Sequence, residues 1–159
     1  MIIFINGSIN SGKSTVAKIL ATKISNTAIV EIDSFHSMIE WMPIEQAVPI
    51  NLENAISTIK NFVNKSLNII VPYPLSQKNY DYMLENLKGL NTKISVFTLA
   101  PKLEKVLVNR GTRDLNDWEI DRINHHYKIG IHTPSFGEII DNSEQTPKQT
   151  ADIILNKIS

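Results

Sequence analysis

Residues 4–20 read FINGSINSGKSTVAKIL, and this stretch constrains the chain more than any other. Gly7, Gly12, Lys13 and Ser14 fit the pattern G-x-x-x-x-G-K-[ST]. The apolar, β-branched run before it, residues 1–6, predicts a strand buried on both faces, and apolar residues at helical spacing after it predict a helix. A phosphate-cradling loop requires this strand–loop–helix context, so the stretch predicts a site for a nucleoside triphosphate.

Such a loop holds phosphate through backbone N–H groups that point inward, and the helix N-terminus adds partial positive charge. Lys13 is predicted to contact the β- and γ-phosphates, and the Ser14 hydroxyl is predicted to bind Mg²⁺. The predicted nucleotide-binding residues of the loop are Gly7, Ser8, Ile9, Asn10, Ser11, Gly12, Lys13, Ser14 and Thr15.

The remaining sequence alternates between strand and helix patterns. Further strands are predicted over 27–33, 67–75, 93–100 and 136–141, and helices over 34–42, 51–66, 76–89, 101–111, 116–129 and 146–158. Ser76 and Thr146 are predicted N-caps, Gly89 a C′ residue, and Pro101 and Pro147 first helical residues. This alternation predicts an α/β fold, with a parallel sheet covered by helices on both faces, as one domain over 1–159. Residues 41–50 are the least regular stretch and are predicted to form a mobile segment near the ligand site.

Composition narrows the class of partner. The 159-residue chain has a formal net charge of zero, which argues against binding a long nucleic acid. It has no cysteine, and its apolar N-terminal run is too short for a signal peptide or a membrane span. We therefore expect a soluble, cytoplasmic protein.

The acid best placed for chemistry is Asp33, which ends the predicted strand TAIVEID. A GTPase is disfavoured because no D-x-x-G or N-K-x-D pattern is present, and the third strand, NIIVPYPL, lacks the acid typical of motors and transporters. Ligands of an open α/β sheet bind outside the carboxyl ends of its strands, so Asp33 is predicted to face the phosphate loop. It is then a candidate base for an alcohol acceptor, and a candidate Mg²⁺ ligand with Ser14. The alternative is that Asp33 only caps the helix that follows it.

The chain has three arginines, Arg110, Arg113 and Arg122. A guanidinium fork suits phosphate oxygens, so the NRGTRD segment is predicted to be a short lid that carries Arg110 and Arg113 over the transferring phosphate. The alternative is a solvated helix end. For Arg122 the preferred interpretation is a solvated helix residue that pairs with acids of its own helix, because Asp117, Glu119 and Asp121 are close in sequence.

No chemistry is assigned to the histidines, which are interpreted as ordinary residues, or to Trp118, which is expected to pack in the core or beneath the lid helix. An apolar set follows Asp33 and could either wall an acceptor pocket or pack in the core. Its members are Phe35, Met38, Trp41 and Met42.

Together, GSINSGKST, EIDSF and RGTR resemble the small P-loop kinases, and are similar to chloramphenicol phosphotransferase-like and shikimate kinase-like proteins. The resemblance implies a P-loop NTPase three-layer α/β/α sandwich, a five-stranded sheet in the order 2-3-1-4-5, and transfer from ATP with Mg²⁺ to a small-molecule hydroxyl. It implies that Lys13, Ser14 and Thr15 hold phosphates and metal, that Asp33 is the base, and that Arg110 and Arg113 serve the lid. It further implies that the adenine lies between Arg110 and the loop at Thr146 and Pro147.

The predicted function is an ATP-dependent phosphotransferase that moves the γ-phosphoryl group to a small-molecule hydroxyl. Two alternatives stay open: a nucleoside, nucleotide or polynucleotide 5′-kinase, and an ATP-binding regulatory protein without turnover. The sequence does not name the acceptor, since related enzymes share catalytic parts across many substrates.

Overall fold

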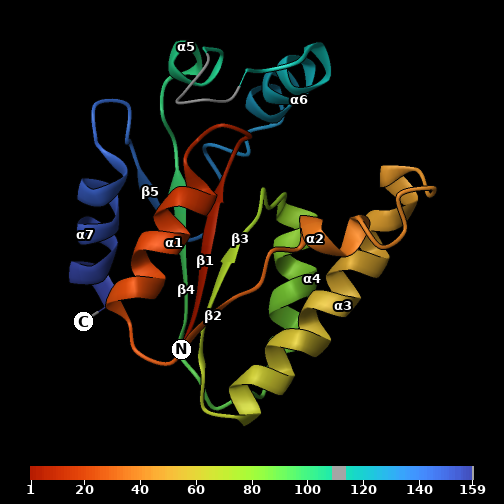
Figure 1. Ribbon diagram of the computed structural model, residues 1–159, viewed down its shortest axis with the longest axis vertical. Coiled ribbons are helices and arrows are strands. Elements are labelled where there is room, and N and C mark those ends of the chain that lie inside the picture. Colours follow the sequence, from red (N-terminus) through yellow and green to blue (C-terminus); the bar gives the residue numbers. More distant parts are fainter. Residues whose placement is uncertain (109–113, 159) are drawn as a thin grey trace.

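The computed structural model describes residues 1–108 and 114–158 as a parallel sheet between two helical layers (Figure 1). The strands are β1 (Ile2–Gly7), β2 (Thr27–Ile29), β3 (Asn68–Pro72), β4 (Ile94–Leu99) and β5 (Glu138–Ile140). The helices are α1 (Lys13–Lys23), α2 (Asp33–His36), α3 (Ile44–Asn64), α4 (Gln77–Leu87), α5 (Leu103–Val106), α6 (Asp117–Lys128) and α7 (Pro147–Ile158).

The strand order is β2-β3-β1-β4-β5, and every pairing is parallel. This confirms the predicted α/β class and the 2-3-1-4-5 order. β1 lies at the centre, so its side chains serve both layers of the core. Ile2 and Phe4 pack with α3 and α4, whereas Ile3 and Ile5 pack with α1 and α7.

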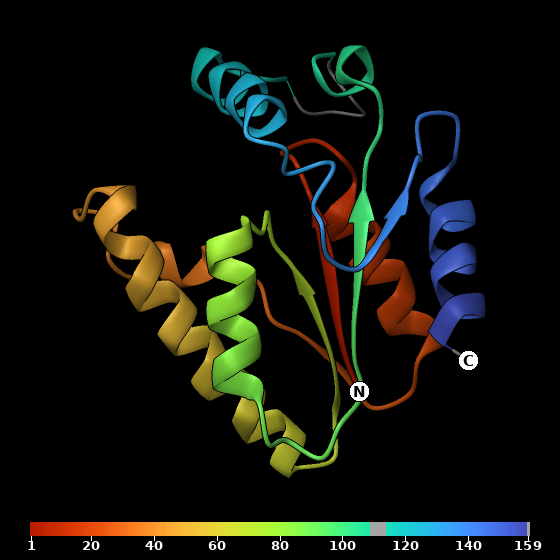
Figure 2. The same ribbon diagram turned by 180° about the vertical axis from the view of Figure 1, so that it is seen from behind.

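Figures 1 and 2 show α1 and α7 on one side of the sheet and α3 and α4 on the other. The helices α5 and α6 lie beyond the carboxyl ends of the strands, above the loop that joins β1 to α1 (Figure 1). This arrangement leaves the loop between the sheet and an outer pair of helices, at the edge where α/β folds bind ligands. Among the described residues, no helix combines the length and apolar character that crossing a membrane requires.

Three local predictions around the first crossover are wrong. β2 ends at Ile29 rather than at Asp33. The helix predicted over 34–42 is replaced by the shorter α2, which begins at Asp33 and ends at His36. α3 begins at Ile44, so residues 44–50 are helical, and not the irregular segment that was expected. The buried stripe that continues back from Leu52 to Ala47 explains this, because its packing outweighs the single hydrogen bond that Pro49 cannot donate.

The helix ends show where cap chemistry can be predicted. Ser76 Oγ accepts a hydrogen bond from Asn79 N at 3.2 Å, Gly89 follows α4 with φ 89°, and Pro147 opens α7, as predicted. Thr146 Oγ1 accepts a hydrogen bond from Gln149 N, which confirms the second N-cap. Pro101 is not a first helical residue, because α5 starts at Leu103 after Lys102, and α5 ends at Val106 within the helix predicted over 101–111.

Candidate active site

The β1–α1 loop takes a backbone path that requires glycine. Gly7 has φ 141°, and a Cβ there would lie 2.6 Å from the Leu99 carbonyl oxygen and 2.7 Å from Ser11 Oγ. Gly12 is the N-cap of α1 with φ 98°. Lys13 Nζ donates to the Ser8 carbonyl oxygen at 2.6 Å, so the ammonium lies across the loop that it follows. The predicted phosphate loop therefore has the strand, turn and helix N-terminus that its function needs.

Hydrogen bonds from distant segments hold this loop in place. Asn142 Nδ2 donates to the Ser11 carbonyl oxygen at 3.0 Å, and Asn10 Nδ2 donates to the Val106 carbonyl oxygen at 2.9 Å. Ser8 Oγ shares a hydrogen bond with His126 Nδ1 at 3.2 Å, and both residues are buried. The loop is thus tied to the turn before α7, to α5 and to α6, and its shape does not depend on local sequence alone.

A cavity of about 840 Å³ opens over the loop. Its lining brings together most of the predicted site residues: Ile9, Asn10, Ser11, Gly12, Lys13, Ser14, Thr15, Asp33 and Pro147. Gly7 and Ser8 lie behind this surface, since both are buried and neither lines the cavity. Arg110 and Arg113, predicted for the lid, lie outside the described residues.

Asp33 faces this cavity from the first residue of α2. Ile32, and not Asp33, is the N-cap residue of α2, so the interpretation of Asp33 as only a helix cap is wrong. Although Asp33 is exposed, surrounding protein displaces enough water to raise the pKa of its carboxyl, and Glu31 adds to that effect. The positive charge of Lys13 acts in the opposite direction and is the largest of the charge effects on this pKa. The site thus holds a carboxylate that is only partly compensated, next to the phosphate loop.

Four cavity residues on α6 were not predicted as site residues. Trp118, Glu119, Arg122 and His126 line the cavity, and their spacing of one, three and four residues places them on one helical face. That spacing is readable from the sequence. Arg122 is half-buried, and among residues 1–108 and 114–158 no ion pair joins it to the acids of its own helix, contrary to the preferred interpretation.

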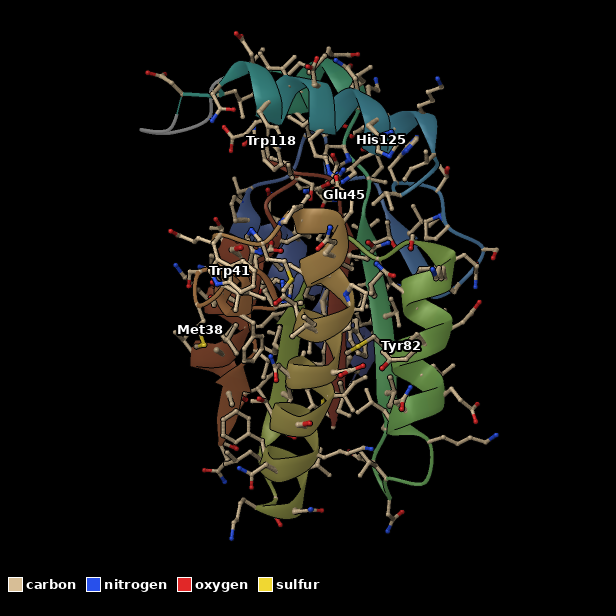
Figure 3. All side chains as sticks on the ribbon, turned by 90° about the vertical axis from the view of Figure 1, so that its right-hand side faces the viewer. Met38, Trp41, Glu45, Tyr82, Trp118 and His125 are labelled. Carbon is tan, nitrogen blue, oxygen red and sulfur yellow. The ribbon has the colours of Figure 1, made fainter. Side chains whose placement is uncertain are left out.

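Two of these α6 residues differ from expectation in their surroundings. Trp118 is 56% exposed, so it does not pack in the core, and Figure 3 shows it below α6, toward the end of the molecule where α3 begins. His126 is buried, and burial, followed by the charges of Arg122 and Lys13, lowers its pKa to about 4. His126 is therefore neutral at neutral pH, which suits its hydrogen bond to Ser8.

The apolar set after Asp33 does not wall the cavity. None of Phe35, Met38, Trp41 and Met42 is among the lining residues. Met38 and Trp41 are 75% and 80% exposed (Figure 3), so core packing is also wrong for these two. Phe35, in contrast, packs against the core. The lining residues on this side are instead His36, Ile44, Val48, Pro72, Tyr73 and Pro74.

The donors present suit Mg²⁺ better than a tightly caged metal. Ser14 and Asp33 offer a hydroxyl and a carboxylate at the cavity surface. No group of three or more His, Cys, Asp or Glu side chains that could hold a metal occurs in the described part of the chain. Mg²⁺ commonly binds through few protein oxygens and takes its other ligands from phosphates and water, so this sparse oxygen set fits it.

A scan against protein-family models finds no match, and a search of curated proteins finds none. The fold does match solved structures. The chain is similar to a sugar kinase from Janibacter sp. HTCC2649, with 17% identity, a TM-score of 0.76, and coverage of 99% of this chain and 93% of that chain. A tunicamycin resistance protein from Deinococcus radiodurans matches with 20% identity, a TM-score of 0.70, and coverage of 99% and 95%. A shikimate kinase from Aquifex aeolicus matches with 17% identity, a TM-score of 0.60, and coverage of 99% and 96%.

These identities show a shared fold, and the fold is that of the small P-loop kinases. The resemblance drawn from GSINSGKST, EIDSF and RGTR is confirmed at this level, together with the three-layer sandwich.

Proposed function

We propose that this protein is an ATP-dependent phosphotransferase that moves the γ-phosphoryl group of ATP to a hydroxyl of a small molecule. The observation that carries the proposal is that one cavity holds both the phosphate loop and the Asp33 carboxylate. A protein that only binds ATP has no need of a carboxylate at that place. Phosphoryl transfer to an alcohol needs one, to orient the hydroxyl and accept its proton.

In this proposal the loop N–H groups and Lys13 bind the β- and γ-phosphates. Asp33 orients the acceptor hydroxyl and takes its proton, and its raised pKa makes it a better base than an ordinary aspartate. Arg122 supplies positive charge at the α6 side of the cavity, and this charge stabilises the negative charge of the phosphoryl group during transfer. Arg110 and Arg113 remain predicted lid residues with the same purpose.

Ser14 and Asp33 are proposed to hold Mg²⁺, which, when bound, neutralises charge on the phosphoryl group. On the opposite side of the loop, Pro147 lines the cavity and Asn142 bonds the loop, so the adenine is proposed to lie there, against Pro147 and Arg110. A single domain over 1–159 and a cytoplasmic location, where ATP is abundant, complete the proposal.

A nucleoside, nucleotide or polynucleotide kinase is the nearest alternative. The zero net charge and the few arginines of the chain disfavour a long polynucleotide acceptor. A screen with γ-labelled ATP and Mg²⁺ over antibiotics, sugars, nucleosides and shikimate-like alcohols tests the proposal.

We expect label transfer to at least one alcohol, and loss of both transfer and ATP binding in Lys13→Ala with the fold intact by circular dichroism. Tight ATP binding by Lys13→Ala would contradict the role of the loop. ATP binding without transfer to any acceptor would favour the regulatory alternative.

A further inference from the structure

Three side chains that line the cavity carry a buried polar atom with no hydrogen-bond partner in the part of the chain that the structure describes: Ser11 Oγ, His36 Nδ1 and Asn142 Oδ1. Such an atom costs free energy, so each marks a place where a ligand can complete the site. Ser11 belongs to the phosphate loop, and its hydroxyl can donate to a phosphate oxygen. His36 lies on α2 with Asp33. Asn142 lies in the turn between β5 and α7 (Figure 1), and its unpartnered atom is an acceptor.

The orientation of the Asn142 amide follows from its hydrogen bond to the phosphate loop. Nδ2 donates to the Ser11 carbonyl oxygen at 3.0 Å. The reverse orientation would place Oδ1 against that carbonyl oxygen, and two acceptors at such a distance repel each other. Oδ1 is therefore the unpartnered end of a side chain that is only 5% exposed. A carboxamide oxygen pairs only with N–H or O–H donors.

The turn that carries Asn142 is held by hydrogen bonds on both sides of this residue. Asp141 Oδ1 accepts from Ser143 N at 2.9 Å and from Ser143 Oγ, and Ser143 Oγ accepts from Lys102 N at 2.9 Å. Gln145 N donates to the Asn142 carbonyl oxygen at 3.3 Å. These bonds fix the position of the Oδ1 acceptor before a ligand arrives, and a preorganised group discriminates between ligands better than a mobile one.

The chemistry of a nucleotide decides which part of it can meet this acceptor. Ionised phosphate oxygens only accept hydrogen bonds, so the triphosphate cannot pair with Asn142 Oδ1. The donors that remain are the hydroxyls of the ribose and the 6-amino group of adenine. Asn142 is followed by Gln145 and Pro147, which also line the cavity, and the proline ring offers an apolar face to a flat purine. A placed acceptor beside an apolar face favours the base as the partner.

Resting on the proposed binding of ATP by the phosphate loop, we propose that Asn142 is a specificity residue that selects a 6-amino purine nucleotide over a 6-oxo purine nucleotide. Oδ1 accepts a hydrogen bond from the exocyclic amine of adenine. Guanine and hypoxanthine carry an oxygen at that position, so two acceptors would face each other with no proton between them. The bond from Nδ2 to Ser11 opposes the turn of the amide that would present a donor instead.

A series of nucleotides tests this inference on the unmodified protein. ATP, purine riboside 5′-triphosphate and ITP differ in the group at position 6 of the purine, which is an amine, a hydrogen or an oxygen. 2′-Deoxy-ATP and 3′-deoxy-ATP keep the amine, and each lacks one ribose hydroxyl. The dissociation constant of each nucleotide is measured by isothermal titration calorimetry with excess Mg²⁺.

We expect loss of the amine to weaken binding by roughly tenfold, and its replacement by oxygen to weaken binding by roughly a hundredfold, because repulsion adds to the lost hydrogen bond. The two deoxy nucleotides should bind within roughly twofold of ATP. Equal affinities of ATP, purine riboside triphosphate and ITP would overturn the proposal. A loss confined to a deoxy nucleotide would overturn it too, because the donor would then belong to the ribose.

A pair of variants separates recognition of the base from loosening of the turn. Asn142→Ala removes Oδ1 together with the bond to Ser11, so the preference for ATP over ITP should fall to within roughly threefold, whatever happens to overall affinity. Ser143→Ala is the matched control, because Ser143 is buried in the same turn but does not line the cavity. It should weaken all the nucleotides by one common factor and keep the preference. A preference that survives in Asn142→Ala would contradict the assignment, and the nucleotide series on the wild type decides if this variant does not fold.

The outcome is separable from the proposed function. Absence of ATP binding would overturn both proposals. ATP binding without discrimination at position 6 would remove only the role of Asn142, whereas discrimination without phosphoryl transfer to any alcohol would remove only the phosphotransferase.

Discussion

The two ends of the cavity are built from different kinds of interaction. At the phosphate end, backbone geometry and hydrogen bonds set the shape, as in the bonds of Asn142 to Ser11 and of His126 to Ser8. At the other end, which we call the acceptor wall, the shape is set by side chains of α3 and of the β3–α4 connection, namely Ile44, Val48, Tyr73 and Pro74. Val48 is also packed against the core. A phosphate is the same in every nucleotide and can be bound by backbone, whereas an acceptor is distinguished by side chains.

One residue joins the two ends. Asn6 at the end of β1 is fully buried, and its Oδ1 accepts a hydrogen bond from Leu75 N at 2.7 Å. Its Nδ2 donates to Thr98 Oγ1 at 3.0 Å and to the Ile131 carbonyl oxygen at 3.1 Å. One fully hydrogen-bonded amide at the start of the phosphate loop therefore fixes the position of Leu75, which directly follows the cavity-lining residue Pro74.

The largest effect is expected from Asp33→Asn, which acts where the two ends meet. The amide keeps the shape but cannot accept a proton, so transfer should fall by about a hundredfold or more, with ATP affinity changed far less. Single-turnover transfer and ATP titration measure the two effects. Full transfer by Asp33→Asn would leave this carboxylate without a base role, and a raised magnesium requirement would assign it to the metal.

The same variant has a pH signature in stability. Because the pKa of Asp33 is raised in the folded state, the native protein binds more protons than the unfolded chain above the ordinary pKa of 3.8. Ionised Asp33 therefore destabilises the fold, and the penalty grows as pH rises through the raised pKa. Asp33→Asn should be more stable than the wild type at neutral pH, and this advantage should vanish below the ordinary pKa in urea unfolding series.

The second prediction concerns a substitution that strains the backbone of the phosphate loop. Gly7→Ala places a Cβ against the Leu99 carbonyl oxygen at 2.6 Å and should lower unfolding free energy by about 3 kcal/mol. Gly12→Ala is the matched control: its φ of 98° is also strained, but the nearest atom would be Asn142 Nδ2 at 3.9 Å, so about 1–2 kcal/mol is expected. Equal losses in urea unfolding would mean that strain alone, and not the close contact, restricts this loop.

The features that the sequence predicted also differ between the phosphate loop and the acceptor wall. The loop and the caps at Ser76 and Thr146 were predicted because each depends on a short local pattern, whereas the strand order was predicted from the resemblance to the small P-loop kinases. The start of α3 was missed because the helix was expected to begin at Asn51, after Pro49, whereas burial of Ala47 and Leu52 favours the longer helix that begins at Ile44. A helix-breaking residue in the sequence does not indicate how strongly tertiary contacts stabilise the helix around it.

The acceptor wall escaped prediction for a different reason. Tyr73, Ile44 and Trp118 come from three segments distant in sequence, and no local pattern says that they border one cavity. The apolar residues nearest Asp33 in sequence, including Trp41, were the wrong candidates, since short turns after α2 leave Trp41 on the surface. Only the α6 face of Trp118, Arg122 and His126 carried a readable signal, in its helical spacing.

The third prediction concerns the tie between α6 and the loop. The pKa of His126, about 4 when folded, lies below the ordinary 6.5, so the native state resists protonation and stability falls as pH drops from about 6.5 through 4. His126→Gln should remove about 2–3 kcal/mol of this pH dependence. Urea unfolding from pH 7 to 4 measures it, with the exposed His125→Gln as control. An unchanged profile in His126→Gln would mean that other groups cause the acid sensitivity.

The smallest effects are expected from a matched pair of helix caps, one at each end of the cavity. Ser76 caps α4, next to the acceptor wall, and Thr146 caps α7, next to Pro147; each Oγ accepts a backbone hydrogen bond at 3.2 Å. Ser76→Ala and Thr146→Ala should each lower unfolding free energy by about 1 kcal/mol, so the two variants are equal in stability.

The Ser76→Ala and Thr146→Ala variants should differ in their affinity for ADP. Thr146→Ala loosens the start of α7, where the adenine is proposed to lie, and should weaken ADP binding by roughly two- to threefold. Ser76→Ala should leave ADP affinity unchanged, because it lies at the other end of the cavity and the Asn6 bond to Leu75 N still fixes the chain one residue before the cap. Calorimetric titration with ADP measures the difference. Equal loss of ADP affinity in both variants would show that the two ends are coupled through the sheet, and that Asn6 transmits changes as well as fixing the register.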